Sequence, residues 1–111
     1  MHTPPVLPGA PTPSLLLSTP SSLTVVVQLS PEGTLPILEV HLQVTGPQGQ
    51  WTVNQTGTFA ASEMVQFEVT GLSADTAYTL VAYTVNYAGM GPSSDGVTYR
   101  TGMMHLRYIS S

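Results

Sequence analysis

Residues 71 to 86 read GLSADTAYTLVAYTVN, a turn-forming run followed directly by a strand-forming run. The Gly, Ser and Asp residues of the first half favour a tight turn. The β-branched and aromatic residues of the second half favour a long strand. A tyrosine at the junction can bury its ring while its hydroxyl bonds to the backbone of the preceding corner. We therefore expect Leu72, Thr76 and Tyr78 to form a structural corner.

Short apolar runs separated by Pro, Gly, Ser and Asn flank this stretch, and no segment shows helical periodicity. This pattern predicts seven strands, over residues 14–17, 23–29, 37–45, 51–54, 65–69, 78–88 and 97–101. Residues 56–62 are expected to be loose or edge structure. Alternation in the second and third strands predicts inward side chains at Leu23, Val25, Val27, Leu29, Leu38, Val40, Leu42 and Val44. The pattern therefore specifies a core.

The end of the sequence also resembles a known family. The corner, Asn86 and the following Gly89, Gly91, Pro92 and Ser93 together resemble the closing third of a fibronectin type III domain. The resemblance extends over residues 11–101, nearly all of the chain between its two tails. It implies an all-β fold: a seven-stranded antiparallel β-sandwich of immunoglobulin-like architecture with fibronectin type III topology.

Two positions depart from the pattern of that family. Its domains usually pack a Trp of the second strand against a Tyr of the third, and here Leu29 and Val40 stand at those positions. Two rings replaced by branched aliphatic side chains would leave a void unless other positions grow or the sheets approach. We expect Phe67, Met64 or Trp51 to compensate. The chain therefore resembles a divergent member of the family.

The length of 111 residues fits a single domain with one core. Five prolines within the first 13 residues block a helix and favour an extended lead. Gly102 is expected to end the last strand. We therefore expect a Pro-rich linker or tail at residues 1–10, a fibronectin type III-like domain at 11–102 and a C-terminal extension at 103–111.

Charge is scarce in this sequence and mostly negative. Charged residues make up 7% of the chain, Lys is absent and the formal net charge is -4. Nucleic acid and anionic membranes require cationic side chains, so neither is an expected partner. With no Cys, disulfides, thiolate nucleophiles and cysteine-metal sites are excluded. No apolar run approaches the ~20 residues of a membrane helix, so neither direct membrane insertion nor an export signal is expected.

The sequence offers no catalytic constellation. His2 and His105 fall in the expected tails, and His41 falls on an outward strand face, where we expect it to be solvated. The acidic residues lack the spacing of a paired-carboxylate or metal-binding site, and no Ser lies in a nucleophile elbow. We therefore expect no enzyme activity, no cofactor and no metal site.

The clearest binding signal lies on the strand after Tyr78. Its outward side chains are apolar, which is unusual for the central strand of a free-standing module. With the following loop and the last strand they give the candidate protein-binding residues Val81, Tyr83, Val85, Tyr87, Met90 and Arg100. Strand propensity alone is the competing explanation. Residues 89–92 are interpreted either as a hairpin turn with positive-φ glycines or as a recognition loop.

The resemblance implies a non-catalytic protein-interaction or spacer module of an extracellular receptor or adhesion protein. Such a module would present the loops at residues 30–36 and 86–94 and the outer face around Tyr83, and its partner would be another protein. The triplet at Asn54 matches the acceptor rule for N-linked glycans, on a segment expected to be exposed. We therefore expect an extracellular or cell-surface location.

Two alternatives stay open. One is a structural decoration or assembly subunit of a virion, tail or filament, which would oligomerise through its outer face or its tails. The other is an accessory carbohydrate-binding module that uses Trp51 with Tyr83 or Tyr87 as stacking platforms.

Overall fold

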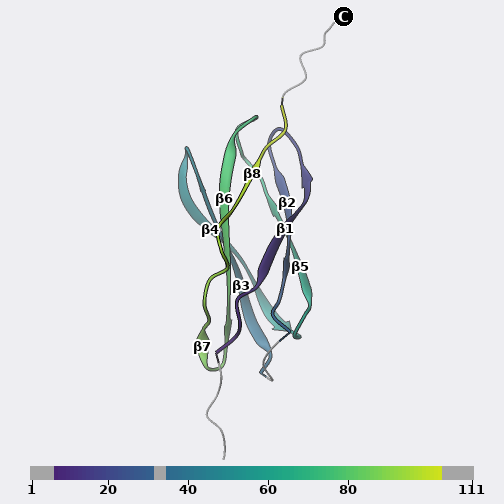
Figure 1. Ribbon diagram of the computed structural model, residues 1–111, viewed down its shortest axis with the longest axis vertical. Helices are drawn as coiled ribbons and strands as arrows, with labels where there is room; N and C mark the ends of the chain where they lie inside the picture. The colour runs from purple at the N-terminus through teal and green to yellow at the C-terminus, as the bar shows by residue number, and fades with distance from the viewer. Residues whose placement is uncertain (1–6, 32–34, 104–111) are drawn as a thin grey trace, which may run out of the picture.

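The computed structural model describes residues 7–31 and 35–103, which form two antiparallel sheets packed as a sandwich (Figure 1). Sheet A has the order β1-β2-β5, and sheet B has the order β4-β3-β6-β7 with β8 also paired to β6. The strands are β1 (Thr12–Ser18), β2 (Leu23–Gln28), β3 (Ile37–Gly46), β4 (Gly49–Phe59), β5 (Met64–Val69), β6 (Ala77–Asn86), β7 (Gly89–Met90) and β8 (Val97–Arg100). The expected all-β sandwich is confirmed. Part of the expected presenting loop and most of the extension at 103–111 lie outside the described residues.

The strand count differs from the prediction because a short additional strand, β7, precedes the last expected strand, which forms as β8. Since β3 occupies one side of β6, both β7 and β8 pair with β6 along the other side. The segment between them stays attached, because the N–H groups of Gly91 and Ser94 donate to the carbonyls of Thr84 and Ala82. Together β7 and β8 take the place of one seventh strand.

The strand predicted over 51–54 is longer than expected. It begins at Gly49, directly after the turn that follows β3, and continues to Phe59 as the edge strand of sheet B. Residues 56–59 are therefore edge structure rather than loose structure. The register with β3 is constant as far as Thr56, which pairs with Glu39, and after a shift Phe59 pairs with Ile37.

The core lies between the sheets and follows the predicted alternation of β2. The inward side chains of β2, β5 and β6 are almost fully buried: Leu23, Val25, Val27, Val65, Phe67, Val69, Tyr78, Leu80 and Ala82. In β3 the prediction is wrong at one end. A register shift between Ile37 and Glu39 turns Ile37 into the core and leaves Leu38 half-buried. An extra residue in a strand reverses the facing of every residue before it, which explains the difference.

The two missing core rings are replaced in part by aromatic residues from elsewhere. Phe67 is buried, and Trp51 packs against the core from β4 with its ring edge-on to Tyr78, 6.4 Å between centroids. Edge-to-face pairs at this distance are favourable. Met64 does not compensate, because it is 65% exposed. Phe67 and Trp51 are thus the two expected substitutes that contact the core.

The predicted corner forms as expected around Tyr78. The ring is fully buried, and the backbone N–H of Ser73 donates to the Tyr78 hydroxyl at 2.8 Å. The hydroxyl in turn donates to Oε1 of Gln48 at 2.8 Å. Leu72 is buried beside the corner, and the Thr76 hydroxyl donates to the carbonyl of Ala74 at 2.8 Å. The tyrosine therefore holds the corner to the turn between β3 and β4.

The described chain enters and leaves at opposite ends of the sandwich (Figure 1). Leu7 lies beside Gly89, next to the β6–β7 turn. At the other end the N–H of Gly102 donates to the carbonyl of Thr19, after β1. Pro8 is buried and packs so closely on Gly91 that a Cβ there would collide with it. The N-terminal lead is therefore in contact with the sandwich before β1 begins.

Candidate protein-binding face

The outer side of sheet B carries the predicted apolar row on β6. Val81, Tyr83 and Val85 point away from the core, and each is half-buried. Their cross-strand partners on β3 are Gln43, His41 and Glu39 in the same order. These six residues, with Met90, are called the β6 face below. An apolar row therefore lies directly beside a polar row, on two adjacent strands.

His41 joins the two rows. Its ring stacks on the ring of Tyr83 with 4.7 Å between centroids and an angle of 3° between the planes. Its Nε2 atom lies 2.7 Å from Oε1 of Glu39, so the imidazole donates to the carboxylate. The expectation of a solvated histidine is wrong, because only 16% of this side chain is exposed. The stack and the hydrogen bond connect the side chains of Tyr83, His41 and Glu39.

Met90 and Tyr87 extend the β6 face at one end. Met90 pairs with Val85 and is 59% exposed, and Tyr87, in the turn between β6 and β7, is 73% exposed. Asn86 builds this turn, since its Oδ1 accepts the N–H groups of Ala88 and Gly89 at 2.8 and 3.3 Å. Two large apolar side chains therefore project into solvent from an ordered hairpin.

The turn is displaced from the position expected at residues 89–92. Its central residues are Tyr87 and Ala88. Positive φ angles were expected at Gly89 and Gly91, and Gly89 has one, 132°. Gly91 is instead buried against Pro8. A hairpin turn therefore forms, but it spans residues 86–89, three residues before the expected position, and Met90 lies on a strand rather than at the tip of a loop.

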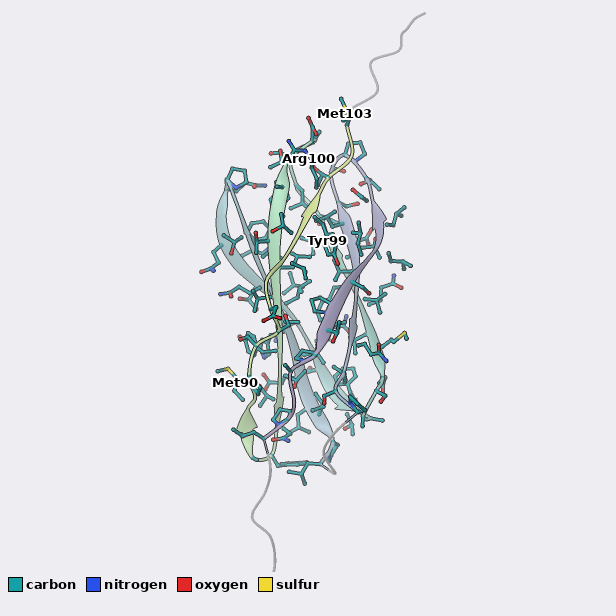
Figure 2. The ribbon with its side chains drawn as sticks, viewed as in Figure 1. Met90, Tyr99, Arg100 and Met103 are labelled. Carbon is teal, nitrogen blue, oxygen red and sulfur yellow. The ribbon has the colours of Figure 1, made fainter. Side chains whose placement is uncertain are left out.

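Arg100 does not join the other candidate residues. It pairs with Ala77 at the start of β6, whereas Met90 pairs with Val85 near its end. Eight residues of strand separate these positions by roughly 26 Å. Figure 2 shows Arg100 and Met90 toward opposite ends of the sandwich. The Nε atom of Arg100 donates to Oδ1 of Asp75 at 2.8 Å, so this side chain belongs to the corner.

Asn54 lies beside the β6 face on strand β4. It pairs with His41, faces outward and is exposed, as expected for a glycan acceptor. Trp51 has the opposite orientation, because it pairs with the buried Val44 and packs against the core. Trp51 and Tyr83 therefore lie on opposite sides of sheet B. The predicted carbohydrate platform made of these two rings is wrong.

The described residues supply little further chemistry. Among them, no group of three or more His, Asp or Glu side chains is placed to hold a metal ion. Within the same residues no helix is long and apolar enough to cross a membrane. The link between His41 and Tyr83 was not foreseen from the sequence. Outward positions on strands expected to be neighbours were the available signal, but pairing them required the register.

Several solved structures resemble this fold. A human fourth FNIII domain superposes with a TM-score of 0.72 and 18% identity, over 97% of this chain and 90% of that chain. The sixth fibronectin type III domain of human fibronectin type III domain containing protein 3 gives 0.67 and 17%, over 98% and 96%. The FN5 domain of Drosophila Lar gives 0.63 and 18%, over 86% and 98%.

No family model matches the chain, and no curated protein matches it. At identities of 17–18% the likeness to solved structures shows the fold alone. That fold is the fibronectin type III sandwich, which confirms the architecture expected from the corner at Tyr78.

Proposed function

We propose that this chain is a non-catalytic protein-binding module and that the β6 face is its binding surface. One observation carries the proposal. On sheet B, the outward row of Val81, Tyr83 and Val85 ends beside two exposed side chains. Met90 and Tyr87 are 59% and 73% exposed at the end of that row. Large exposed apolar patches of this kind mark interaction sites.

The composition of the face supports a protein partner. Aromatic residues and Met are enriched in protein interfaces, and polar residues form their rims. Here Tyr83, Tyr87 and Met90 provide the apolar contacts, and Glu39 and Gln43 provide the polar side. Because the His41 stack fixes Tyr83 before binding, little side-chain freedom is lost on association.

The favoured setting is an extracellular receptor or adhesion protein. Modules of the fibronectin type III fold are common in such proteins, and the resemblance carries that setting to this chain. The entry and exit of the described chain at opposite ends suit modules joined in line. The exposed acceptor at Asn54 agrees with a secreted location.

The test uses a matched pair of exposed methionines. The immobilised chain is screened against a library of extracellular protein domains, and each binding domain is titrated by surface plasmon resonance. We expect Met90→Asp to weaken binding at least about tenfold, as for an interface anchor. Met64→Asp is the control, because Met64 is 65% exposed on sheet A, away from the β6 face.

The contrary result is also defined. A partner that binds Met90→Asp and Tyr87→Ser as tightly as the unchanged chain would overturn the assignment of this face. Equal loss with Met64→Asp would indicate a general effect on the fold rather than a contact.

A further inference from the structure

Strand β4 forms one edge of sheet B. The outer edge of a terminal strand presents unpaired N–H and C=O groups, which can pair with a further strand. Proteins usually protect such edges with charges, Pro, bulges or short strands. Each edge of the sandwich can be checked for these protections.

Three of the other edge strands carry such protections. β1 has a register shift between Leu15 and Leu17. β7 has two residues, and β8 has four and carries the charged Arg100. These features make a second strand hard to add along any of them.

The remaining edge of sheet A, β5, is protected in two ways. It carries Glu68, and Glu63 directly precedes it. Its central carbonyl, that of Gln66, is already taken, because the side-chain Nε2 of Gln55 donates to it at 2.6 Å. The donor, Gln55, is on β4, so a side chain of β4 protects the edge of β5.

β4 is the least protected edge, because its register shift with β3 lies near its end, between Thr56 and Phe59. It is 11 residues long, the longest strand described, and it contains no charged residue and no Pro. From Gly49 to Thr56 it keeps one register with β3 over eight consecutive pairs, without a bulge. Within the described residues it makes no backbone hydrogen bond beyond that ladder. Thr52, Asn54 and Thr56 are exposed along it.

We propose that β4 is a homotypic pairing edge: it binds the β4 strand of a second copy, antiparallel about a two-fold axis. The N–H and C=O groups of one edge would bond to those of the other and join the two B sheets. An antiparallel strand pair about a two-fold axis brings the same residues of both copies together, so the surface is self-complementary.

No charge on β4 opposes a second copy at this edge. The chain carries a net charge of -4, so two copies repel wherever their acidic residues meet. β4 contributes none of those acids, and the acid on the adjacent strand, Glu39, is hydrogen-bonded to His41. Pairing along β4 therefore brings no acid of this strand against its counterpart in the second copy. This surface is separate from the β6 face, which stays open in the pair.

The first experiment is sedimentation velocity of the full chain over a concentration series. We expect a reversible dimer, and we expect Thr52→Lys combined with Thr56→Lys to weaken it at least about tenfold by bringing like charges together. Gln66→Lys on β5 and Leu16→Lys on β1 are the controls, because both positions are exposed on other edge strands. Circular dichroism checks that each variant keeps the β-sheet spectrum.

The second experiment reports the geometry. Because the chain has no Cys, single substitutions Thr52→Cys, Asn54→Cys and Thr56→Cys give the only thiol in each variant. Under mild oxidation we expect at least one of them to cross-link far faster than Thr98→Cys, which is exposed on β8. The position that cross-links fastest is the one closest to its own copy, and therefore closest to the two-fold axis.

Three outcomes overturn the proposal. The first is that the unchanged chain stays monomeric across the concentration series. The second is that the β5 or β1 variant breaks the dimer and the β4 variant does not. The third is that no β4 cysteine cross-links faster than Thr98→Cys. None of these outcomes bears on partner binding through Met90, so the two proposals fail independently.

Discussion

The hydroxyl of Tyr78 donates to Oε1 of Gln48 at 2.8 Å and so links strand β6 to the turn between β3 and β4. The hydroxyl oxygen of Tyr78 also accepts a hydrogen bond from the N–H of Ser73 at 2.8 Å. One buried phenol therefore connects the corner before β6 with a turn 30 residues away in sequence. Both hydrogen bonds share the hydroxyl oxygen of Tyr78.

Removing this hydroxyl should destabilise the chain without changing its fold. Tyr78→Phe leaves the Ser73 N–H without its acceptor, and a lost buried hydrogen bond costs about 1–2 kcal/mol. Urea unfolding measures the loss, and circular dichroism should keep the β-sheet spectrum. Tyr83→Phe is the control, because its hydroxyl bonds to none of the other described residues. An equal stability for Tyr78→Phe and the unchanged chain would contradict the role of the corner.

Gly46 should tolerate no side chain while Tyr78 is present. A Cβ at Gly46 would overlap Cδ1 and Cε1 of the Tyr78 ring. We expect Gly46→Ala to cost about 2–3 kcal/mol, because overpacking a core forces neighbours from their positions. The backbone of Gly46 is not in the positive-φ region, so the cost comes from the contact.

A double-mutant cycle isolates this contact. In a Tyr78→Leu background the ring is absent, and Gly46→Ala should cost much less. If the penalty of Gly46→Ala is the same in both backgrounds, the ring is not its cause.

Two buried threonines should respond oppositely to the same substitution. Thr84 is fully buried, and its Oγ1 has no hydrogen-bond partner among the described residues. Thr84→Val removes that unpaired hydroxyl at nearly constant volume and should stabilise the chain by about 1 kcal/mol.

The matched case is Thr101. Its Oγ1 accepts the N–H of Thr76 at 3.0 Å and donates to the carbonyl of Ser73 at 2.5 Å. Thr101→Val should therefore destabilise the chain by about 1–2 kcal/mol. Thermal unfolding of the two variants should give shifts of opposite sign. Two shifts in the same direction would show that the hydrogen bonds do not control the difference.

The β6–β7 turn should depend on Asn86. Asn86→Ala removes the acceptor of two turn N–H groups, and we expect a loss of about 1 kcal/mol in unfolding free energy. Hydrogen exchange should show faster exchange at Ala88 and Gly89, with the amides of β2 unchanged. Unchanged exchange at those two amides would contradict the prediction.

The corner and much of the core were predictable from sequence because both depend on short-range patterns. The run from Leu72 to Tyr78 carries its own turn signals, and the alternation in β2 has no interruption. The facing of Leu38 was missed because the register shift depends on the partner strands, and the glycine within it, Gly57, lies on β4 rather than on β3. A bulge of this kind depends on the pairing of three strands.

The candidate site was predictable as a list but not as an arrangement. The apolar row follows from alternation on β6, yet the separation of Arg100 from Met90 depends on which ends of β6 pair with β7 and β8. The pairing of His41 with Tyr83 likewise requires the register of β3. Sequence alternation fixes the face of a residue, and strand pairing fixes its neighbours.

The position of Asn54 has a consequence for how the chain is produced. It lies on β4 within residues 49–56, which keep one register with β3, and its side chain faces outward. A sugar tree attached there would stand over the very strand that two copies need to share. Protein made in bacteria and protein made in a secreting eukaryotic cell would then differ in their state of association, although their amino-acid sequences are identical.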